Sequence, residues 1–236
     1  MCAEISKNFD EAMSAIIEAQ KQIFKLFPEC VLVGGSATAL HCEHRYSVDA
    51  DSVLSNLKDD YDRVLERLET LSGWRTNRKK PPVLILGNFH GVDIGIRQLR
   101  RELPLETEVR GGIRIPVIEE MIRIKAWMVL TRNAMRDYID LAALYEKAGS
   151  DKFACAMTIF DECYPQPEDT EMSGVQLSRM LRCPKPYDFD EDVLGLYKGL
   201  RSPLNSWEYV AKKCSEASDI LFDTIFSKNP GEEERQ

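Results

Sequence analysis

The sequence lacks any long uninterrupted hydrophobic run. Its 236 residues are 44% hydrophobic, yet no window approaches eighteen consecutive apolar residues, the length typical of a membrane-spanning helix. The amino-terminal stretch MCAEISKNFDEAM alternates charged and apolar residues, whereas a signal peptide carries an apolar block. We therefore expect a soluble, cytoplasmic protein with no membrane partner, and one that is large enough to bury a substantial core.

The sequence also lacks the paired cysteine and histidine motifs that are typical of disulfide frameworks and zinc sites. The seven cysteines are an odd number, are widely spread and form no CxxC pair, which suits reduced thiols better than a disulfide framework. Two of the three histidines fall in the run HCEH, residues 41–44. A zinc site would need a second ligand pair at a suitable spacing, and none follows. The plainer interpretation of this run is an exposed helix end.

Acidic residues outnumber basic ones overall, but positive charge is concentrated in one segment. The net charge of −8 argues against a protein that coats nucleic acid. Residues 75–136 nevertheless hold 13 Lys and Arg against 6 Asp and Glu, while the counts are 7 against 13 before this segment and 11 against 20 after it. Such a basic segment indicates either a surface that holds a polyanion or an ordinary solvated surface.

Strand-like patterns are confined to the first half of the chain. Hydrophobic spacing and turn residues there predict a helix at 9–27, a buried strand at 30–33, a short helix capped by Ser36, a strand at 48–54 and a helix at 59–72. The stretch RTNRKKPP, residues 75–82, has the composition of a loop. Two hairpins follow, one joining 83–87 to 91–96 and one turning at Gly111 and Gly112.

From residue 117 onward the periodicity is helical. Helices are predicted over about 117–131, 134–148, 150–162, 190–200 and 205–227. Strands followed by helices predict an α+β fold, in which a lobe with a β-sheet precedes a helical lobe. We expect a core domain at 1–116, a helical region at 117–228 that completes the active-site cleft, and a disordered tail at 229–236.

The stretch GGSATALHCEHRYSVDADSVL, residues 34–54, holds the first candidate site. In a strand, Asp49 and Asp51 project from the same face, because successive side chains alternate. Two carboxylates side by side repel each other unless a proton or a cation lies between them. Oxygen ligands of this kind suit Mg²⁺ or Mn²⁺, although a solvent-facing strand with two aspartates is the simpler interpretation of the pair alone.

The glycines ahead of this pair favour the metal interpretation. Gly34 and Gly35 let the backbone approach a bulky anion, and the amides at the start of the Ser36 helix favour phosphate there. A phosphate cradle followed closely by a carboxylate pair is what a nucleoside triphosphate with its metal requires. Taken alone, GGS is an ordinary strand-to-helix turn.

A third carboxylate would complete a site for two cations, and Asp93 in GVDIGI is the candidate. It alternates with the apolar Val92 and Ile94, and Gly95 leaves room beside it. Because aspartate is disfavoured in strands, one centred in an apolar strand calls for an explanation. We expect a metal-binding or general-base role for Asp93.

These residues resemble the polymerase-β-like nucleotidyltransferase superfamily, whose hallmarks are a GG[S/T] turn, an Asp-x-Asp strand and a later strand aspartate. Within it the chain is similar to the AbiEii-type nucleotidyltransferase toxin family. The matching segments are GGSATAL, His44-Arg45, SVDAD, Lys125 in EEMIRIKAWM, RDYIDL at 136–141 and WEYVAKKC. The sequence departs from the family pattern at Ala50 and Ser52, where bulky apolar residues are usual.

The resemblance implies a nucleotidyltransferase-type mixed β-sheet with flanking helices and the transfer of a nucleoside monophosphate from an NTP. It implies Mg²⁺ or Mn²⁺ as cofactor and a cognate antitoxin protein as partner. The implied catalytic and metal-binding residues are Asp49, Asp51 and Asp93. Those implied in nucleotide binding are Gly34, Gly35, Ser36, Lys125 and Asp140.

The sequence is compatible with more than one acceptor for the nucleoside monophosphate. The family resemblance implies RNA, notably the 3′ end of tRNA, and the basic segment would suit a nucleic-acid backbone, with Arg75, Arg78, Lys79 and Lys80 as candidate contacts. Protein or small-molecule acceptors are alternatives. A different class of alternative is a catalytically inactive protein of the same fold that binds a nucleotide or a partner.

Overall fold

The computed structural model describes residues 2–47, 49–195, 197 and 199–227. The predicted tail at 229–236 lies outside the described residues. The chain divides into two compact units, Met1–Val117 and Ile118–Gln236. Within the described part of the chain, no helix is long and apolar enough to cross a membrane.

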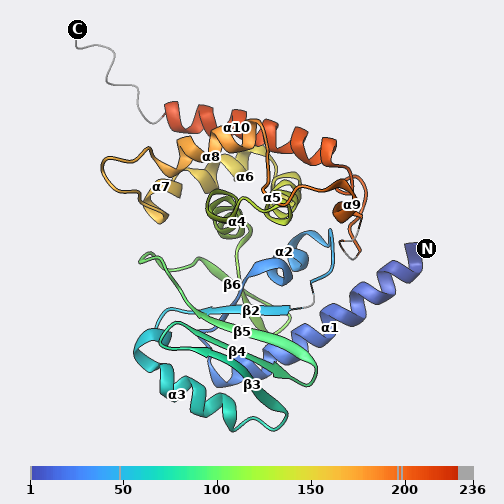
Figure 1. The fold of residues 1–236 in the computed structure, drawn as a ribbon, viewed down its shortest axis with the longest axis vertical. Helices are drawn as coiled ribbons and strands as arrows, with labels where there is room; N and C mark the ends of the chain where they lie inside the picture. Colours follow the sequence, from blue (N-terminus) through green and yellow to red (C-terminus); the bar gives the residue numbers. More distant parts are fainter. Residues whose placement is uncertain (1, 48, 196, 198, 228–236) are drawn as a thin grey trace. The chain divides into compact units, whose positions relative to one another are not determined.

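The first unit is built around a mixed five-stranded sheet with the order β1-β2-β5-β4-β3 (Figure 1). Its strands are β1 (Val31–Leu32), β2 (Asp49–Leu54), β3 (Trp74–Lys80), β4 (Leu84–Phe89) and β5 (Val92–Gln98). Its helices are α1 (Cys2–Leu26), α2 (Gly34–Cys42) and α3 (Leu57–Glu69), and a separate hairpin joins β6 (Thr107–Arg110) to β7 (Ile113–Pro116). The predicted α+β fold class is therefore confirmed.

One face of the sheet is buried and the other is more accessible. Ala50, Ser52 and Leu54 of β2 are at most 1% exposed, whereas Asp49 and Asp51, which alternate with them, are accessible. Ser52, at a position usually apolar in the family, donates its hydroxyl hydrogen to Gln20 Oε1 of α1 at 3.1 Å. This hydrogen bond offsets the cost of burying the Ser52 hydroxyl group. The alternation therefore fixes which side chains of β2 reach solvent.

Two expectations about local structure in this unit are wrong. Residues 74–80 form the edge strand β3, not a loop, because β4 supplies antiparallel partners from Trp74↔Phe89 to Lys80↔Leu84. Polar side chains are tolerated on this edge strand because most of them are exposed. Helix α2 begins at Gly34, so Ser36 lies inside the helix and does not cap it.

The second unit is helical. Its elements are α4 (Ile118–Arg132), α5 (Met135–Ala148), α6 (Ser150–Met157), α7 (Phe160–Cys163), α8 (Ser173–Arg182), α9 (Glu191–Leu194) and α10 (Trp207–Ser227). Helix α5 is buried along most of its length, and α10 packs against α8, α5 and α6 (Figure 1). Tyr138, Phe153 and Phe160 are among its largest fully buried side chains. Helix α8 is absent from the sequence prediction.

Candidate functional site

The parallel pairing of β2 with β5 brings the predicted strand aspartates together. The register places Asp49 beside Asp93 and Asp51 beside Gly95. Residues paired across neighbouring strands point to the same face of a sheet, so the side chains of Asp49, Asp51 and Asp93 all project from the more accessible face. Residues 44 positions apart in the chain thus become neighbours.

Glycine leaves space for the Asp51 carboxylate on this face. A Cβ atom added at Gly95 would lie 2.6 Å from Asp51 Oδ1, closer than real contacts of this kind. A Cβ at Gly34, whose φ is +72°, would lie 3.4 Å from Asp51 Cβ. The two glycines therefore flank the same carboxylate, one from β5 and one from the start of α2.

The turn at Gly35 faces a cation, Arg45, which the sequence analysis named only as part of the family resemblance and not as a site residue. A Cβ at Gly35 would lie 2.9 Å from an Arg45 guanidinium nitrogen and 3.0 Å from Ser47 Oγ. Val33 N donates to Asp51 O at 2.7 Å, which ties the turn to β2. A glycine turn at a helix start with a guanidinium beside it combines two features that favour an anion.

Ser36 and the HCEH run have structural partners. The Ser36 hydroxyl donates to the backbone oxygen of Asp49, so its side chain fastens α2 to the start of β2. His41 and His44 are only 7% and 3% exposed. His41 Nε2 is 2.9 Å from Pro116 O. The expectation that this run forms an exposed helix end is therefore wrong, because both rings pack into the unit.

Two further side chains contact the carboxylates. Arg97 Nε lies 3.3 Å from Asp51 Oδ1, and both side chains are partly exposed. Asn88 Nδ2 donates to Asp93 Oδ1 at 2.8 Å, and Asn88 Oδ1 accepts from Gly91 N at 2.9 Å. Asn88 therefore links the β4–β5 turn to Asp93. Arg97 supplies a positive charge next to Asp51.

The donor set fits a hard divalent cation in its chemistry. Three carboxylates on one sheet face, with glycine making room for one of them, are oxygen ligands of the kind that Mg²⁺ and Mn²⁺ prefer. In the present geometry, however, no group of three Asp, Glu, His or Cys side chains among the described residues stands close enough to hold a metal ion. Arg97 occupies one side of Asp51, so a cation would have to displace it.

In the second unit, Lys125 and Asp140 form a buried ion pair. Lys125 Nζ lies 2.6 Å from Asp140 Oδ2 and 3.5 Å from Asp137 Oδ1, and the three side chains are 0–3% exposed. Arg132 Nη2, on a side chain that is 42% exposed, lies 3.0 Å from Asp137 Oδ1. Lys125 is therefore not a surface lysine. The charges form a chain that runs from a buried lysine to an accessible arginine.

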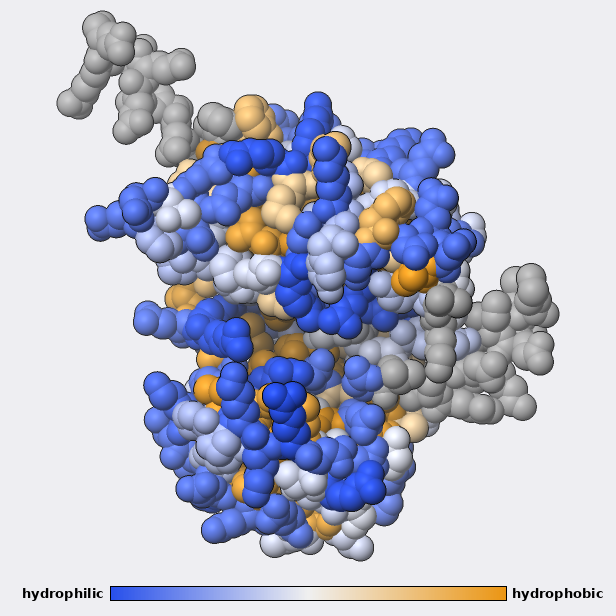
Figure 2. Space-filling model, viewed as in Figure 1, coloured by the Kyte–Doolittle hydropathy of each residue, from blue (hydrophilic) through white to orange (hydrophobic). Residues whose placement is uncertain are grey.

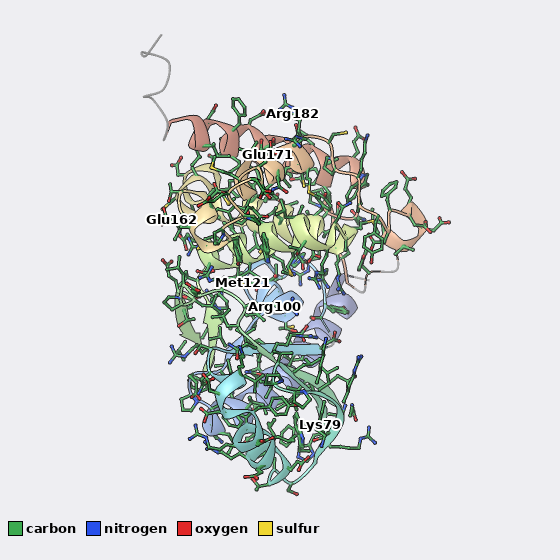
Figure 3. The ribbon with its side chains drawn as sticks, turned by 60° about the vertical axis from the view of Figure 1, so that its left-hand side comes forward. Lys79, Arg100, Met121, Glu162, Glu171 and Arg182 are labelled. Atoms are coloured by element: carbon green, nitrogen blue, oxygen red, sulfur yellow. The ribbon has the colours of Figure 1, made fainter. Side chains whose placement is uncertain are left out.

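The predicted nucleic-acid contacts lie on the edge strand β3. Arg75, Arg78, Lys79 and Lys80 are all exposed, and the pairing of β3 with β4 is interrupted between Thr76 and Arg78. Hydrophilic residues predominate in the lower part of Figure 2, where β3 lies in Figure 1. Lys79 is labelled on this outer strand in Figure 3. The structure thus gathers these four cations on one edge, where lysine also discourages strand pairing between molecules.

Comparison with known proteins defines the class of this protein. Residues 18–188 match the family model described as "Nucleotidyl transferase AbiEii toxin, Type IV TA system". Because the match covers more than half of the chain, the protein belongs to the AbiEii nucleotidyltransferase toxin family of type IV toxin–antitoxin systems.

Individual relatives are distant. The structure of JHP933 from Helicobacter pylori is 18% identical, with a TM-score of 0.49 over 94% of this chain and 93% of that one. A second H. pylori structure, of a presumed nucleotidyltransferase, is 18% identical, with a TM-score of 0.46 over 95% and 97%. The heme uptake protein MmpL11 of Mycobacterium tuberculosis is 26% identical over 130 residues, which are 52% of this chain. This chain spans only 13% of the length of that relative.

Proposed function

We propose that the protein transfers a nucleoside monophosphate from an NTP to an acceptor hydroxyl, with Asp49, Asp51 and Asp93 as the acidic centre. The observation that carries the proposal is the register of the parallel β2–β5 pair, which sets Asp93 beside Asp49. A bound Mg²⁺ or Mn²⁺ would neutralise charge on the triphosphate. In this proposal the three aspartates hold that cation.

The chain's own residues account for the remaining steps. The amides of Gly34 and Gly35, with the Arg45 guanidinium nearby, hold phosphate oxygens at the start of α2, which Ser36 fastens to β2. An oxygen of the acceptor hydroxyl forms a bond to the α-phosphorus, and the bond to the β-phosphate oxygen breaks. Asp93 takes the acceptor's proton, and pyrophosphate leaves with the electron pair.

Lys125 and Asp140 enter the proposal through the family motif. A lysine is a suitable point charge for a triphosphate, and Asp140 holds its ammonium group at 2.6 Å. Because Lys125 is only 3% exposed, Asp140 and Asp137 fix its position. In this proposal the pair contributes to nucleotide binding, with Asp140 acting as the residue that positions Lys125.

The acceptor that we favour is RNA, in particular the 3′ end of tRNA, and the biological role is that of a toxin restrained by an antitoxin protein. The exposed cations Arg75, Arg78, Lys79 and Lys80 on β3 support a polyanionic acceptor. Small-molecule and protein acceptors predict different behaviour. The rate of transfer to a small-molecule or protein acceptor would be insensitive to salt over the range in which binding to RNA weakens steeply.

The direct test is incubation with each α-³²P-labelled NTP, Mg²⁺ and total cellular RNA, followed by electrophoresis. We expect labelled RNA with the wild-type protein and at least about a hundredfold less with Asp51→Asn or Asp93→Asn, as for other groups that stabilise a transition state. Asp62→Asn, an exposed substitution on α3, is the matched control and should label normally. Full activity of Asp51→Asn would refute the assignment of the acidic centre.

A catalytically inactive, nucleotide-binding protein would give a different pattern. It would show thermal stabilisation by an NTP with Mg²⁺ but no label in RNA, protein or small molecules. No stabilisation by any of the four NTPs, with or without Mg²⁺, would contradict nucleotide binding altogether.

A further inference from the structure

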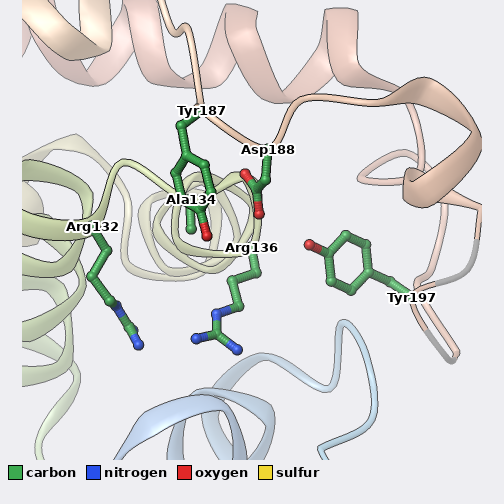
Figure 4. Close-up of a pocket in the computed structure, with 6 residues that line it drawn as sticks. All are labelled: Arg132, Ala134, Arg136, Tyr187, Asp188 and Tyr197. Carbon is green, nitrogen blue, oxygen red and sulfur yellow. The ribbon is translucent and has the colours of Figure 1, made fainter.

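A pocket of about 410 Å³ lies entirely within the second unit, and the predicted site residues lie outside it. Figure 4 shows its lining, which comprises Arg132, Ala134, Arg136, Tyr187, Asp188 and Tyr197. This volume is within the range of small-molecule sites. The lining is unusual in combining two guanidinium groups, two phenol rings and one carboxylate.

The backbone around the pocket is held by hydrogen bonds between two separate segments. Tyr187 N donates to Asn133 O at 3.0 Å, and Asn133 Nδ2 donates to Lys185 O at 2.9 Å. Asp188 Oδ1 accepts from Met135 N at 2.7 Å. The turn between α4 and α5 and the segment 185–188 therefore present their side chains from a fixed frame.

Two side chains of this frame, those of Tyr187 and Arg136, are exposed to solvent. Tyr187 is 76% exposed, the largest value among the exposed large hydrophobic side chains of the described residues. Arg136 is exposed and has no ion-pair partner in the part of the chain that the structure describes. In Figure 4 the Arg132 and Arg136 side chains extend in the same direction, and the Tyr197 hydroxyl points toward the middle of the group.

We infer that this pocket binds one nucleotide unit. The exposed Tyr187 ring offers a stacking surface for a base, a contact that tolerates any base because each has a π-face. Arg132 and Arg136 offer planar donors for a phosphate group. Asp188 keeps one oxygen beyond its bond to Met135 N, and this oxygen accepts a hydrogen bond from a ribose hydroxyl, as carboxylates do in other nucleotide sites.

The pocket is connected to the charged cluster of the family motif. Arg132 Nη2 is 3.0 Å from Asp137 Oδ1, and that oxygen is 3.5 Å from Lys125 Nζ. A phosphate bound by Arg132 would therefore compete with Asp137 for the same guanidinium. The inference rests on the proposed function for the source of the nucleotide, which is either the NTP or the RNA acceptor.

The test measures binding alone, with no divalent metal and no transfer. Two fluorescent probes are titrated with the full chain and followed by anisotropy, a 12-nucleotide single-stranded oligoribonucleotide and an N-methylanthraniloyl NTP. Tyr187→Ala is expected to weaken one of them about tenfold, and Tyr187→Phe to bind within about twofold of wild type. Arg136→Gln is expected to weaken the same probe. Matched controls are Phe222→Ala, an exposed aromatic of α10, and Arg179→Gln, an exposed arginine of α8.

The two probes identify the source of the nucleotide. If only binding of the oligoribonucleotide is weakened, the pocket holds a nucleotide of the acceptor. If only binding of the NTP is weakened, the pocket holds the donor. Either result supports the inference. Asp188→Asn should also reduce the preference of the affected probe for ribose over deoxyribose. The inference is overturned if Tyr187→Ala and Arg136→Gln leave both probes within twofold of wild type, or if the two controls lose as much.

The binding test and the labelling test together distinguish an error in the pocket inference from an error in the proposed function. If wild-type protein labels RNA and the Tyr187→Ala variant binds and labels equally well, the pocket inference falls and the transfer proposal stands. If no acceptor is labelled but Tyr187→Ala still weakens a probe, the transfer proposal falls and the pocket stands.

Discussion

Arg97 lies against Asp51, with its Nε 3.3 Å from Oδ1, on the sheet face that carries Asp49 and Asp93. A guanidinium at this place stabilises the carboxylate by Coulomb attraction. A divalent cation on Asp51 would be repelled by the same group. A cation bound there would therefore compete with Arg97 for one oxygen ligand.

Removing this competitor should tighten metal binding. We expect Arg97→Gln to bind Mn²⁺ several-fold more tightly than wild type, because a nearby positive charge disfavours a bound cation. Titration calorimetry or the EPR signal of free Mn²⁺ measures the affinity directly. Arg63→Gln, which removes an exposed arginine from α3, is the control. Unchanged or weaker Mn²⁺ binding in Arg97→Gln would contradict the competition.

The space at Gly95 should be essential for the Asp51 carboxylate. In Gly95→Ala the new Cβ would meet Asp51 Oδ1 at 2.6 Å and Leu86 Cδ2 at 3.2 Å. Asp51 must then rotate, so we expect at least about a tenfold loss of transfer rate, as a misplaced catalytic group costs. Gly195→Ala, where the nearest atom is at an ordinary 3.6 Å, should be tolerated. An unaffected rate in Gly95→Ala would show that Asp51 has no need of its present position.

The buried ion pair should be important for the stability of the second unit. Asp140→Ala leaves the Lys125 ammonium in a buried site with only the longer contact to Asp137. We expect the free energy of unfolding in urea to fall by about 3 kcal/mol. Asp219→Ala, which breaks an exposed pair with Arg182, should change it by less than about 1 kcal/mol. Equal effects in the two variants would contradict this account.

The thiols should differ sharply in reactivity. Burial raises the pKa of Cys30 and of Cys214 to about 12, so both stay protonated at pH 8. Cys155 and Cys183 are exposed. We expect iodoacetamide to label the exposed pair within minutes and to spare the buried pair, as mapped by peptide mass spectrometry. Labelling of all four should follow in denaturant, and rapid labelling of Cys30 in the native protein would contradict its burial.

The basic edge should contribute to RNA binding through charge alone. Replacing Lys79 and Lys80 with Gln should weaken binding of different RNA sequences to a similar degree. If both lysines contact phosphates, the slope of log K against log salt should become shallower by about 1.4, at about 0.7 for each contact with a single strand. Lys152→Gln, an exposed lysine of α6, is the comparison. An unchanged slope would indicate that these lysines of β3 do not contact phosphates and instead serve solubility.

The sequence predicted those parts of the site that depend on local periodicity. Alternation placed Asp49 and Asp51 on one strand face, and the glycines marked the turn beside them. It could not provide the β2–β5 register, because parallel pairing is set by contacts between strands far apart in the chain. Arg97 was missed for this reason, since nothing near Asp51 in sequence indicates it.

The errors in the fold have a similar cause. Strand β3 was predicted as a loop because four of its residues are exposed cations and it lacks the apolar alternation of a half-buried strand. Its conformation is imposed by hydrogen bonds to β4. Ser36 was predicted as a cap from its residue type, whereas tertiary structure directs its hydroxyl to Asp49 O. Helix α8, despite buried Leu177 and Leu181, was not recognised, because it is a short helix between two segments that contain prolines, residues 165–167 and 184–186.

The parallel pairing of β2 with β5 also has a consequence for biosynthesis. Residues 55–91 separate the two strands, so a growing polypeptide that has passed Asp51 still lacks the partner strand and its aspartate. Pairing across such an interval is intrinsically slow, because loop closure precedes the stabilising contacts. An incomplete chain released from the ribosome before β5 would carry the glycine turn and two aspartates but would lack Asp93 and the strand that holds it beside Asp49.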